Sequence, residues 1–471
     1  MRTGPVPRLS WPLTPLQRGL LAPPHRRPGA ARQVGQLAWR WHGPLDTARF
    51  TRAWQQVADC ESVLRAGFEW RPEPRITVHA HATVEVVRHR APAPGWEALA
   101  EHDRRRGFDP RRPALLRLTL VQGPAVPRGP VAPTRILLTY HPVMLDGWSA
   151  LVLLHEFYRA YLADGAPTGG QRRPDMRDYA HWLAAQDTAP AREFWSQALP
   201  GDASAVLTAP IAPAAPAAPA GPGGPSAPSG RAGTGRAEAR LVRADAERLR
   251  RWAAGHAATE SIALQAVWAL LLYRAGGTTA PAPVGFGVSV SGRGIALDSV
   301  ERLPGLLLNA LPVVVRVDPD HSLSQLLAGL RDQALGMAGY EWVSAEQIRA
   351  WCGRAPGQDL IESLIAFQHL PPLPADLEQA LAAQGVRVEA PEASGWCTAF
   401  PLALLGYRDT DGGLVLAAVH DRGRVADGDA QRLVRLCARL LRDLPALPGR
   451  NPTTADVLAT VAGDELPRIA G

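Results

Sequence analysis

The sequence predicts a mixed α/β protein built from two lobes. Its 471 residues exceed what a single hydrophobic core usually supports, so two compact bodies are expected. Strand patterns alternate with helix patterns in both halves of the chain, as they do in α/β folds. Residues 208–235 are nearly all Ala, Pro, Gly and Ser and cannot offset their ordering entropy, which predicts a flexible linker. We therefore predict one lobe over residues 1–200, a linker over 201–236 and a second lobe over 237–471.

The first half carries the signals of alternating strands and helices. Thr14 and Pro15 predict a helix start, because threonine caps a helix and proline suits its first position. Alternating apolar side chains predict a half-buried strand over 37–41, and residues 44–46 open a helix. Apolar runs predict further strands at 64–68, 76–78, 115–120 and 136–138, and helices at 176–187 and 191–199.

The second half repeats this α/β texture. Helices are predicted from Asp245, over residues 262–273, from Ser322 to about Met337, and from about 427 to 444. Strands are predicted at 237–242, 284–290, 306–308, 313–315, 364–367, 386–389, 402–407 and 414–419. No short-period repeat is visible, and it stays open whether the two halves are a diverged pair.

The composition excludes several classes of function. Every basic residue is an arginine, which excludes lysine chemistry, and the arginines are scattered, so we expect no nucleic-acid partner. The N-terminus lacks a signal-peptide h-region, and the longest apolar run, 262–273, is too short to span a membrane. The four cysteines are Cys60, Cys352, Cys397 and Cys437, and they lie too far apart in the sequence to form a metal site. We expect them to be reduced thiols in a cytoplasmic protein.

The candidate site is the turn over residues 139–149, which lies between a predicted strand and a predicted buried helix. Ser149 is expected to cap the helix. His141, Asp146 and Gly147 crowd into one tight turn, where side chains and backbone N–H groups can face a cleft. The alternative is a solvated turn that does no more than cap the helix.

Five further segments, taken with this turn, resemble the condensation domain of nonribosomal peptide synthetases. The resemblance covers almost the whole chain. Residues 12–17 (PLTPLQ) match the opening helix of that family, and residues 63–68 (VLRAGF) match its "vLRt-F" segment. The remaining segments match the helices that close the first lobe, the "G…SGR" segment and the "GxxxNxLP" motif: residues 179–187 with 194–195, residues 286–287 with 291–293, and residues 305–312.

The resemblance implies two lobes, each similar to chloramphenicol acetyltransferase, arranged in a V around a central tunnel. Acyl donor and acceptor would enter this tunnel on the phosphopantetheine arms of acyl or peptidyl carrier proteins. No bound cofactor or metal is expected. The sequence ends at Gly471 without a carrier-domain serine motif, so we expect a free-standing domain that meets its carriers in trans.

The family signature is HHxxxDG, and this chain departs from it at one position. His141, Asp146 and Gly147 match, but Pro142 replaces the second histidine, which orients or deprotonates the acceptor amine. The resemblance implies that His141 and Asp146 are mainly structural, with Arg293 as the partner of Asp146. It also implies that the tunnel is lined by Trp148, Ser149, Arg293, Asn309 and His369.

Proline cannot replace an imidazole, because it has no titratable group and no N–H. Condensation is still conceivable, since two tethered substrates gain from proximity and an unprotonated amine attacks thioesters unaided. The N–H of Gly147 could polarise a developing oxyanion, and His369 is a candidate substitute base. Cys60 and Glu61, which stand where the family usually has Arg-His, are a further departure.

Two functions therefore compete. The first is a condensation-type acyltransferase of antibiotic or other secondary metabolism that forms an amide, or less readily an ester. The second is a catalytically degenerate platform that binds carrier protein or recruits a tailoring enzyme. Epimerisation, heterocyclisation and coenzyme A-dependent acetyl transfer are disfavoured, because the families that perform them use residues that are missing here.

Overall fold

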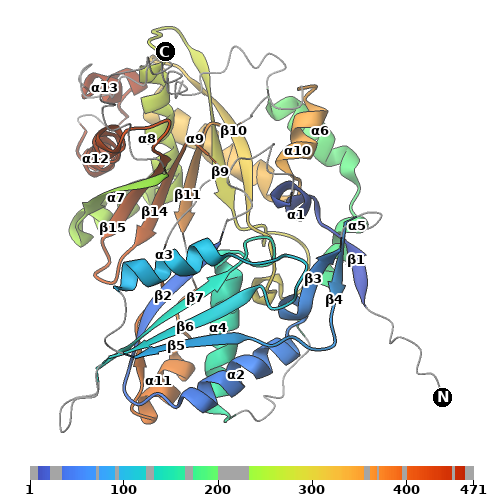
Figure 1. Cartoon of the computed structure of the whole chain (residues 1–471). Coiled ribbons are helices and arrows are strands. Elements are labelled where there is room, and N and C mark those ends of the chain that lie inside the picture. The colour runs from blue at the N-terminus through green and yellow to red at the C-terminus, as the bar shows by residue number, and fades with distance from the viewer. Residues whose placement is uncertain are drawn as a thin grey trace, which may run out of the picture. The chain divides into compact units, whose positions relative to one another are not determined.

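The computed structural model describes residues 9–21, 34–69, 74–90, 95–123, 132–164, 173–199, 233–354, 361–368, 371–394, 400–447 and 451–461. They form two compact units, each with helices and a mixed β-sheet (Figure 1). Unit 1 comprises Met1–Gln186, Ala296–Leu307 and Leu370–Cys397, and unit 2 comprises Asp187–Ile295, Leu308–His369 and Thr398–Gly471. The predicted α/β class is confirmed. Most of the predicted linker lies outside the described residues.

The main sheet of unit 1 has the strand order β12-β2-β7-β6-β5. Its strands are β2 (Gly35–His42), β5 (Glu85–Arg90), β6 (Leu116–Gln122), β7 (Thr134–Tyr140) and β12 (Arg387–Val388). Helices α2 (Thr47–Cys60) and α4 (Gly147–Leu162) lie on one face, and α3 (Trp96–Arg106) lies on the other (Figure 1). The other elements of this unit are β1 (Ser10–Pro12), α1 (Pro15–Leu20), η3 (Ser62–Arg65), β3 (Ala66–Glu69), β4 (Arg75–Val78), α5 (Met176–Ala184), η5 (Val300–Arg302), α11 (Ala375–Ala383) and β13 (Glu392–Ser394).

The sheet of unit 2 has the strand order β10-β9-β11-β14-β15-β8. Its strands are β8 (Thr234–Leu241), β9 (Ala282–Val290), β10 (Asn309–Val317), β11 (Ser363–Gln368), β14 (Leu402–Arg408) and β15 (Leu414–Asp421). The helices are α6 (Thr188–Ala198), α7 (Arg243–Gly255), α8 (Glu260–Ala275), α9 (Leu323–Ala338), α10 (Ala345–Trp351), α12 (Asp427–Asp443) and α13 (Thr454–Ala459), with the short turn η6 (Leu444–Ala446).

Four neighbouring strands are arranged in the same way in the sheets of both units. In unit 1 the path runs β2-β7-β6-β5, and the successive pairings are antiparallel, antiparallel and parallel. In unit 2 the path β8-β15-β14-β11 has the same three pairings in the same order. This correspondence supports the idea that the halves are a diverged pair, and it makes β7 and β15 equivalent strands.

Several predicted elements differ from the structure. Residues 64 and 65 belong to a 3₁₀ turn rather than a strand, and residues 306–308 are not a strand, since β10 begins at Asn309. Helix α7 begins at Arg243, with Val242 and not Asp245 at its N-cap. The predicted strand at 386–389 is only the two-residue β12. Helices α3, α10, α11 and α13 and strands β1, β5 and β13 were missed, because they are short or carry many polar side chains.

Helix α4 is fixed to unit 1 by aromatic packing against α2. The rings of Trp54 and Phe157 stack with centroids 4.8 Å apart, and Phe50 meets Phe157 edge-on at 4.7 Å. All three side chains are fully buried. Aromatic pairs of this kind contribute specific geometry beyond their buried area. The helix that follows the candidate turn is therefore held in place along its length.

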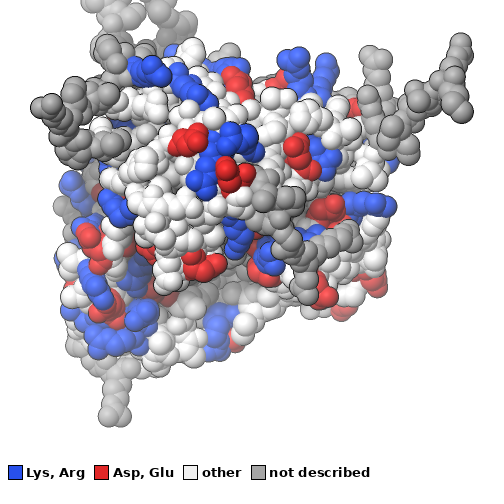
Figure 2. Space-filling model, turned by 90° about the horizontal axis from the view of Figure 1, so that it is seen from below, with Lys and Arg blue, Asp and Glu red and all other residues white. Residues whose placement is uncertain are grey.

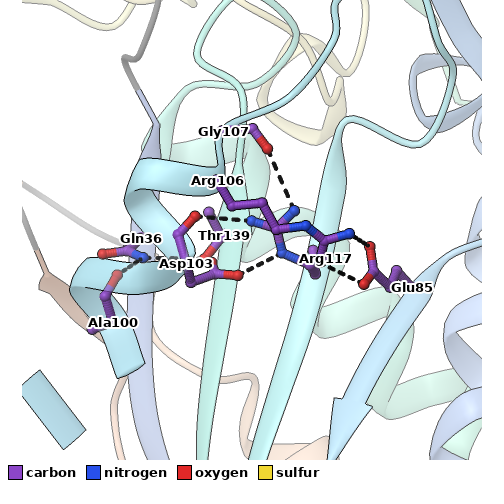
Figure 3. A network of polar contacts seen from close by, with 8 residues as sticks. All are labelled: Gln36, Glu85, Ala100, Asp103, Arg106, Gly107, Arg117 and Thr139. Atoms are coloured by element: carbon purple, nitrogen blue, oxygen red, sulfur yellow. Dashed lines mark hydrogen bonds and ion pairs between the residues drawn. The ribbon is translucent and has the colours of Figure 1, made fainter. Parts of the chain in front are cut away.

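Strand β7 is braced by a buried polar network on the α3 side of the sheet (Figure 3). Gln36 donates from Nε2 to the carbonyl oxygen of Ala100 at 3.0 Å and to Oγ1 of Thr139 at 3.3 Å. Arg117 on β6 donates from Nε to Oδ1 of Asp103 at 2.5 Å, and both side chains are almost fully buried. A buried pair of this kind is expensive to break. The network therefore fixes the strand that leads into the candidate site.

Candidate active site at the strand-to-helix turn

The candidate turn joins the end of β7 at Tyr140 to the start of α4 at Gly147. Asp146, not the predicted Ser149, is the N-cap of α4, because its Oδ1 accepts the N–H of Ser149 at 2.8 Å. The sequence could not separate the two positions, because aspartate and serine are both good N-cap residues. In the structure the helical conformation begins directly after Asp146, three residues earlier than predicted. Pro142 lies half-buried in the turn that precedes this cap.

His141 is a buried residue that ties the turn together. Its Nδ1 accepts the N–H of Val143 at 3.1 Å, and its own N–H donates to the carbonyl oxygen of Leu115 at 3.0 Å. Burial lowers the pKa of His141 to about 4. The ring is therefore neutral near pH 7, and because Nδ1 accepts, its proton is on Nε2. In this state the ring has no free lone pair with which to act as a base.

The carboxylate of Asp146 connects the turn to a segment that lies far along the sequence. Its Oδ2 accepts the N–H of Leu307 at 3.1 Å, and the N–H of Asp146 donates to the carbonyl oxygen of Gly305 at 3.2 Å. The Ser149 hydroxyl lies 2.8 Å from Oδ1 of Asp146 and 2.6 Å from the carbonyl oxygen of Gly305, and it accepts the N–H of Gly305 at 2.9 Å. Ser149 is thus a buried link inside the protein.

Residues 296–307, which belong to unit 1, form a strap across the start of α4. Besides the bonds to Gly305 and Leu307, the indole Nε1 of Trp148 donates to the carbonyl oxygen of Glu301 at 2.7 Å. Gly305 lies against Met176, and a Cβ at this position would come within 2.1 Å of the Met176 sulfur. A glycine is needed here because the backbone approaches its neighbours so closely.

Gly147 is the first residue of α4 and lies beside the cap. Within the described part of the chain, no group accepts its N–H. A Cβ on Gly147 would meet only the hydroxyl oxygen of Tyr140, at 3.9 Å, which is an ordinary van der Waals distance. The N–H of Gly147 is therefore available to a ligand, at the end of the helix where the peptide dipoles favour negative charge.

A comparison with known protein families agrees with this geometry. A family model described as the Condensation domain matches residues 9–460 of the chain. This protein is a member of the condensation-domain family. The resemblance drawn from the sequence motifs is thereby confirmed.

The relatives of this condensation domain are much longer proteins. It is 28% identical over 455 residues to one of the linear gramicidin synthase subunits of Brevibacillus parabrevis, an alignment that covers 93% of this chain and 5% of that relative. It is 27% identical over 376 residues to surfactin synthase subunit 2 of Bacillus subtilis, an alignment that covers 77% of this chain and 10% of that relative. The chain therefore spans only a small part of the length of these curated relatives.

Solved structures show the same fold at lower identity. The condensation domain from Monacolin K polyketide synthase has a TM-score of 0.72 and 18% identity, covering 94% of this chain and 98% of that chain. The X-domain from teicoplanin biosynthesis has a TM-score of 0.69 and 23% identity, covering 94% and 96% of the two chains. The condensation domain described here thus consists of two chloramphenicol acetyltransferase-like lobes.

The structure places two of the remaining predicted site residues in unit 2. Asn309 donates from Nδ2 to the carbonyl oxygens of Glu341 at 2.9 Å and Val343 at 2.7 Å. The Glu341 carboxylate accepts the N–H of Gly292 at 2.8 Å and so holds the turn that carries Arg293. Burial raises the pKa of Glu341. The sequence singled out Asn309 and Arg293 but missed Glu341, since a lone glutamate after a helix carries no signal of its own.

Two further expectations stay predictions. Asp146 and Arg293 belong to different units, so their ion pair is not tested. His369 lies outside the described residues, as does Cys397, whereas Cys60, Cys352 and Cys437 are free thiols.

No competing metal site is found in the described residues, and the one face drawn in Figure 2 shows no patch of a single charge. On the face in Figure 2, basic and acidic side chains are interspersed rather than gathered by sign. No group of three or more His, Cys, Asp or Glu side chains in the described segments is arranged to hold a metal ion. None of the described helices combines the length and apolar character needed to cross a lipid bilayer. The strand-to-helix turn is therefore the feature on which a functional proposal rests.

Proposed function

We propose that this condensation domain forms an amide bond between a carrier-bound acyl thioester and an amine acceptor. The observation that carries the proposal is the intact framework of the turn. Asp146, Ser149 and the strap at Gly305 fix the start of α4, and they leave the N–H of Gly147 without a protein acceptor in the described chain. A framework held by this many buried hydrogen bonds positions a donor for a developing negative charge.

The reaction proceeds without a histidine base. Pro142 has no titratable group, and His141 is neutral with its Nδ1 occupied by the N–H of Val143. An unprotonated amine attacks a thioester when both are held close together, and such positioning alone contributes a large part of the rate. An acceptor hydroxyl would need a base, so the proposal favours an amide over an ester.

The predicted roles of the remaining residues belong to this proposal. Asp146 and Arg293 brace the site, the substrates travel on phosphopantetheine, and the chain meets acyl or peptidyl carrier domains. The predicted substrate-lining role stays with Trp148, Arg293 and His369, whereas Ser149 and Asn309 are buried and hydrogen-bonded within the protein. The wide separation of the cysteines supports a reaction in the cytoplasm. The proposal is the same whether the carrier domain belongs to this polypeptide or to another.

The test is an acyl-transfer assay with purified protein. Carrier proteins loaded with candidate acyl groups are mixed with amine acceptors, and the products are identified by mass spectrometry. We expect amide formation above the protein-free rate, lost in Asp146→Asn and kept in Asp427→Asn, the matched change at the start of helix α12. No transfer above the protein-free rate with any pair would contradict the proposal.

Pro142 also favours a second function, a platform that binds carrier protein or recruits a tailoring enzyme without performing chemistry. The variant Pro142→His separates the two functions. A large gain of amide formation in this variant indicates that the turn still supports condensation once a base is present. Unchanged inactivity, together with a carrier or partner-enzyme complex measurable by calorimetry, indicates a platform.

A further inference from the structure

Tyr140, the last residue of β7, places its hydroxyl next to the first residue of α4. The hydroxyl oxygen lies 3.9 Å from the position that a Cβ would take on Gly147. The ring of Tyr140 lies across Gly35 on β2. A Cβ added to Gly35 would come within 2.3 Å of Cζ and 2.6 Å of the hydroxyl oxygen of Tyr140. Gly35 is therefore required for this ring position, and the hydroxyl lies between two glycines whose backbones leave space around it.

The hydroxyl of Tyr140 has no hydrogen-bond partner among the described residues, although the residue is only 7% exposed. Tyr158 on α4 also has a hydroxyl without a partner in the described chain, but that oxygen is sealed from solvent. Buried polar groups normally find partners, so an unpartnered hydroxyl at a helix start indicates a place for a ligand.

The equivalent position in unit 2 carries a ring whose tip is in contact with a protein group. Gly35 pairs with Tyr140 between β2 and β7, and Gly235 pairs with His420 between the equivalent strands β8 and β15. His420 also lies against its glycine, and its Nε2 lies 2.9 Å from Oδ1 of Asp427 at the start of α12. In unit 2 a carboxylate thus occupies the place between ring tip and helix start, and in the described part of unit 1 no protein group does.

The Tyr140 hydroxyl is a hydrogen-bond donor rather than a base. Burial and the negative charge of Asp146 raise the pKa of Tyr140, so the phenol stays protonated. A neutral phenol offers its proton to an oxygen that gains negative charge. Gly147, whose Cβ position would lie 3.9 Å from this hydroxyl, carries an N–H that no group of the described chain accepts.

We propose that the Tyr140 hydroxyl and the Gly147 N–H together bind the carbonyl oxygen of the acyl thioester during condensation. The proposal rests on the amide-forming function proposed above and names a catalytic residue for it. The amine lone pair forms the C–N bond, and the carbonyl electron pair moves to the oxygen, which accepts both hydrogen bonds. When the C=O bond re-forms, the C–S bond breaks, and the proton lost by nitrogen passes to the leaving thiolate.

The experiment compares Tyr140→Phe with Tyr158→Phe in the acyl-transfer assay. Neither variant removes a hydrogen bond within the described protein, so both are expected to keep the wild-type Tm. Tyr140→Phe is expected to lower kcat by about 10²-fold, as for the loss of one oxyanion donor, with KM for the loaded carrier unchanged. Tyr158→Phe is expected to keep the wild-type kcat.

The outcomes separate this proposal from the proposed function. If the wild type is active and Tyr140→Phe keeps its kcat, or if both variants lose activity equally, the role of Tyr140 is overturned while amide formation stands. If the wild type shows no transfer, both proposals fail. A fluorinated tyrosine at position 140 keeps the shape and makes the phenol a stronger donor, so kcat should hold or rise. A fall to the level of Tyr140→Phe would overturn the donor role.

Discussion

Strands β7 and β15 have the same place in their units, yet the turns that follow them use their polar groups differently. In unit 2 the fully buried His420 reaches Asp427 at 2.9 Å, and Arg422 donates to the same carboxylate at 2.9 Å. In unit 1 the Asp146 carboxylate bonds instead to Ser149 and Leu307 within its own framework. The tip of the Tyr140 ring and the Gly147 N–H are left without a protein partner in the described chain.

The difference separates a structural turn from a turn that can bind a ligand. In unit 2 the Asp427 carboxylate contacts Nε2 of His420 and accepts from Arg422, so a ligand at the tip of this ring would have to displace a charged group. In unit 1 the Asp146 carboxylate bonds to Ser149 and to the Leu307 N–H, and two donors, the Tyr140 hydroxyl and the Gly147 N–H, remain without an acceptor in the described chain. A duplicated fold can therefore keep the same strand path in both units while only one of them offers hydrogen bonds to a substrate.

Replacing the two aspartates by asparagine tests this comparison with the largest expected effect. Asp146→Asn is expected to destabilise the protein by about 3 kcal/mol. The asparagine side chain has one acceptor oxygen where aspartate has two, so either the Ser149 N–H or the Leu307 N–H loses its partner. Asp427→Asn should cost less than about 1 kcal/mol, because that side chain is 52% exposed. Urea unfolding of both variants measures the two losses in the free energy of unfolding. Equal losses would show that the carboxylates of Asp146 and Asp427 contribute equally to stability.

The sequence could predict the framework of the site but not the way it is hydrogen-bonded. His141, Asp146 and Gly147 were found because a turn that concentrates these residue types is unusual. Tyr140 was missed because a tyrosine that ends a buried strand looks like an ordinary core residue. Its role depends on Gly35, which lies far earlier in the sequence and becomes its neighbour only through the pairing of β2 with β7.

The fold was predicted for similar reasons. Long periodic segments such as α8 and α12 carry their own evidence in the sequence. The strap at 296–307 and strand β13 do not, because they are held by contacts with distant parts of unit 1 rather than by local propensity. The departure at Pro142 was readable from the sequence alone, but the neutral state of His141 depends on its burial and its bond to Val143.

The stability of unit 1 should depend on pH through His141. Burial holds its pKa at about 4 in the folded protein, against 6.5 for a histidine free in water. Between these values the unfolded state binds more protons than the folded state, so stability falls as the pH drops from about 6.5 to about 4 and is level outside that range. The expected loss is about 2 kcal/mol between neutral pH and about pH 5.

A variant isolates this contribution. His141→Asn places an amide oxygen near the position of Nδ1, where it can still accept the Val143 N–H, and it removes the titration. His155→Gln should also flatten the profile, because burial lowers the pKa of His155 to about 4 as well, so the two variants divide the pH dependence between the two histidines. Urea unfolding across this pH range should give a flatter profile for His141→Asn. An unchanged slope would mean that His141 does not stay neutral in the folded protein.

The two glycines beneath the equivalent rings provide a smaller effect. A Cβ on Gly35 would come within 2.3 Å of the Tyr140 ring, and a Cβ on Gly235 would come within 2.2 Å of Nε2 of His420. Each alanine substitution should cost about 1–2 kcal/mol, because a ring must move from its place. Gly35→Ala should also lower acyl transfer, whereas Gly235→Ala should leave it intact. The double variant Gly35→Ala/Tyr140→Ala should be no more stable than Gly35→Ala, since truncating the buried ring leaves a cavity, and it should stay inactive, as measured by Tm and by the transfer assay.

The smallest effect on stability is expected for Gly147→Ala. Its Cβ would lie 3.9 Å from the Tyr140 hydroxyl, and the backbone at this position is not in the left-handed region, so the free energy of unfolding should change by less than about 0.5 kcal/mol. The added methyl group nevertheless takes up space beside the Tyr140 hydroxyl, where the proposed carbonyl oxygen must bind. Amide formation should therefore fall at least tenfold while the Tm stays at the wild-type value, and unchanged activity would show that the substrate oxygen does not lie between Tyr140 and Gly147.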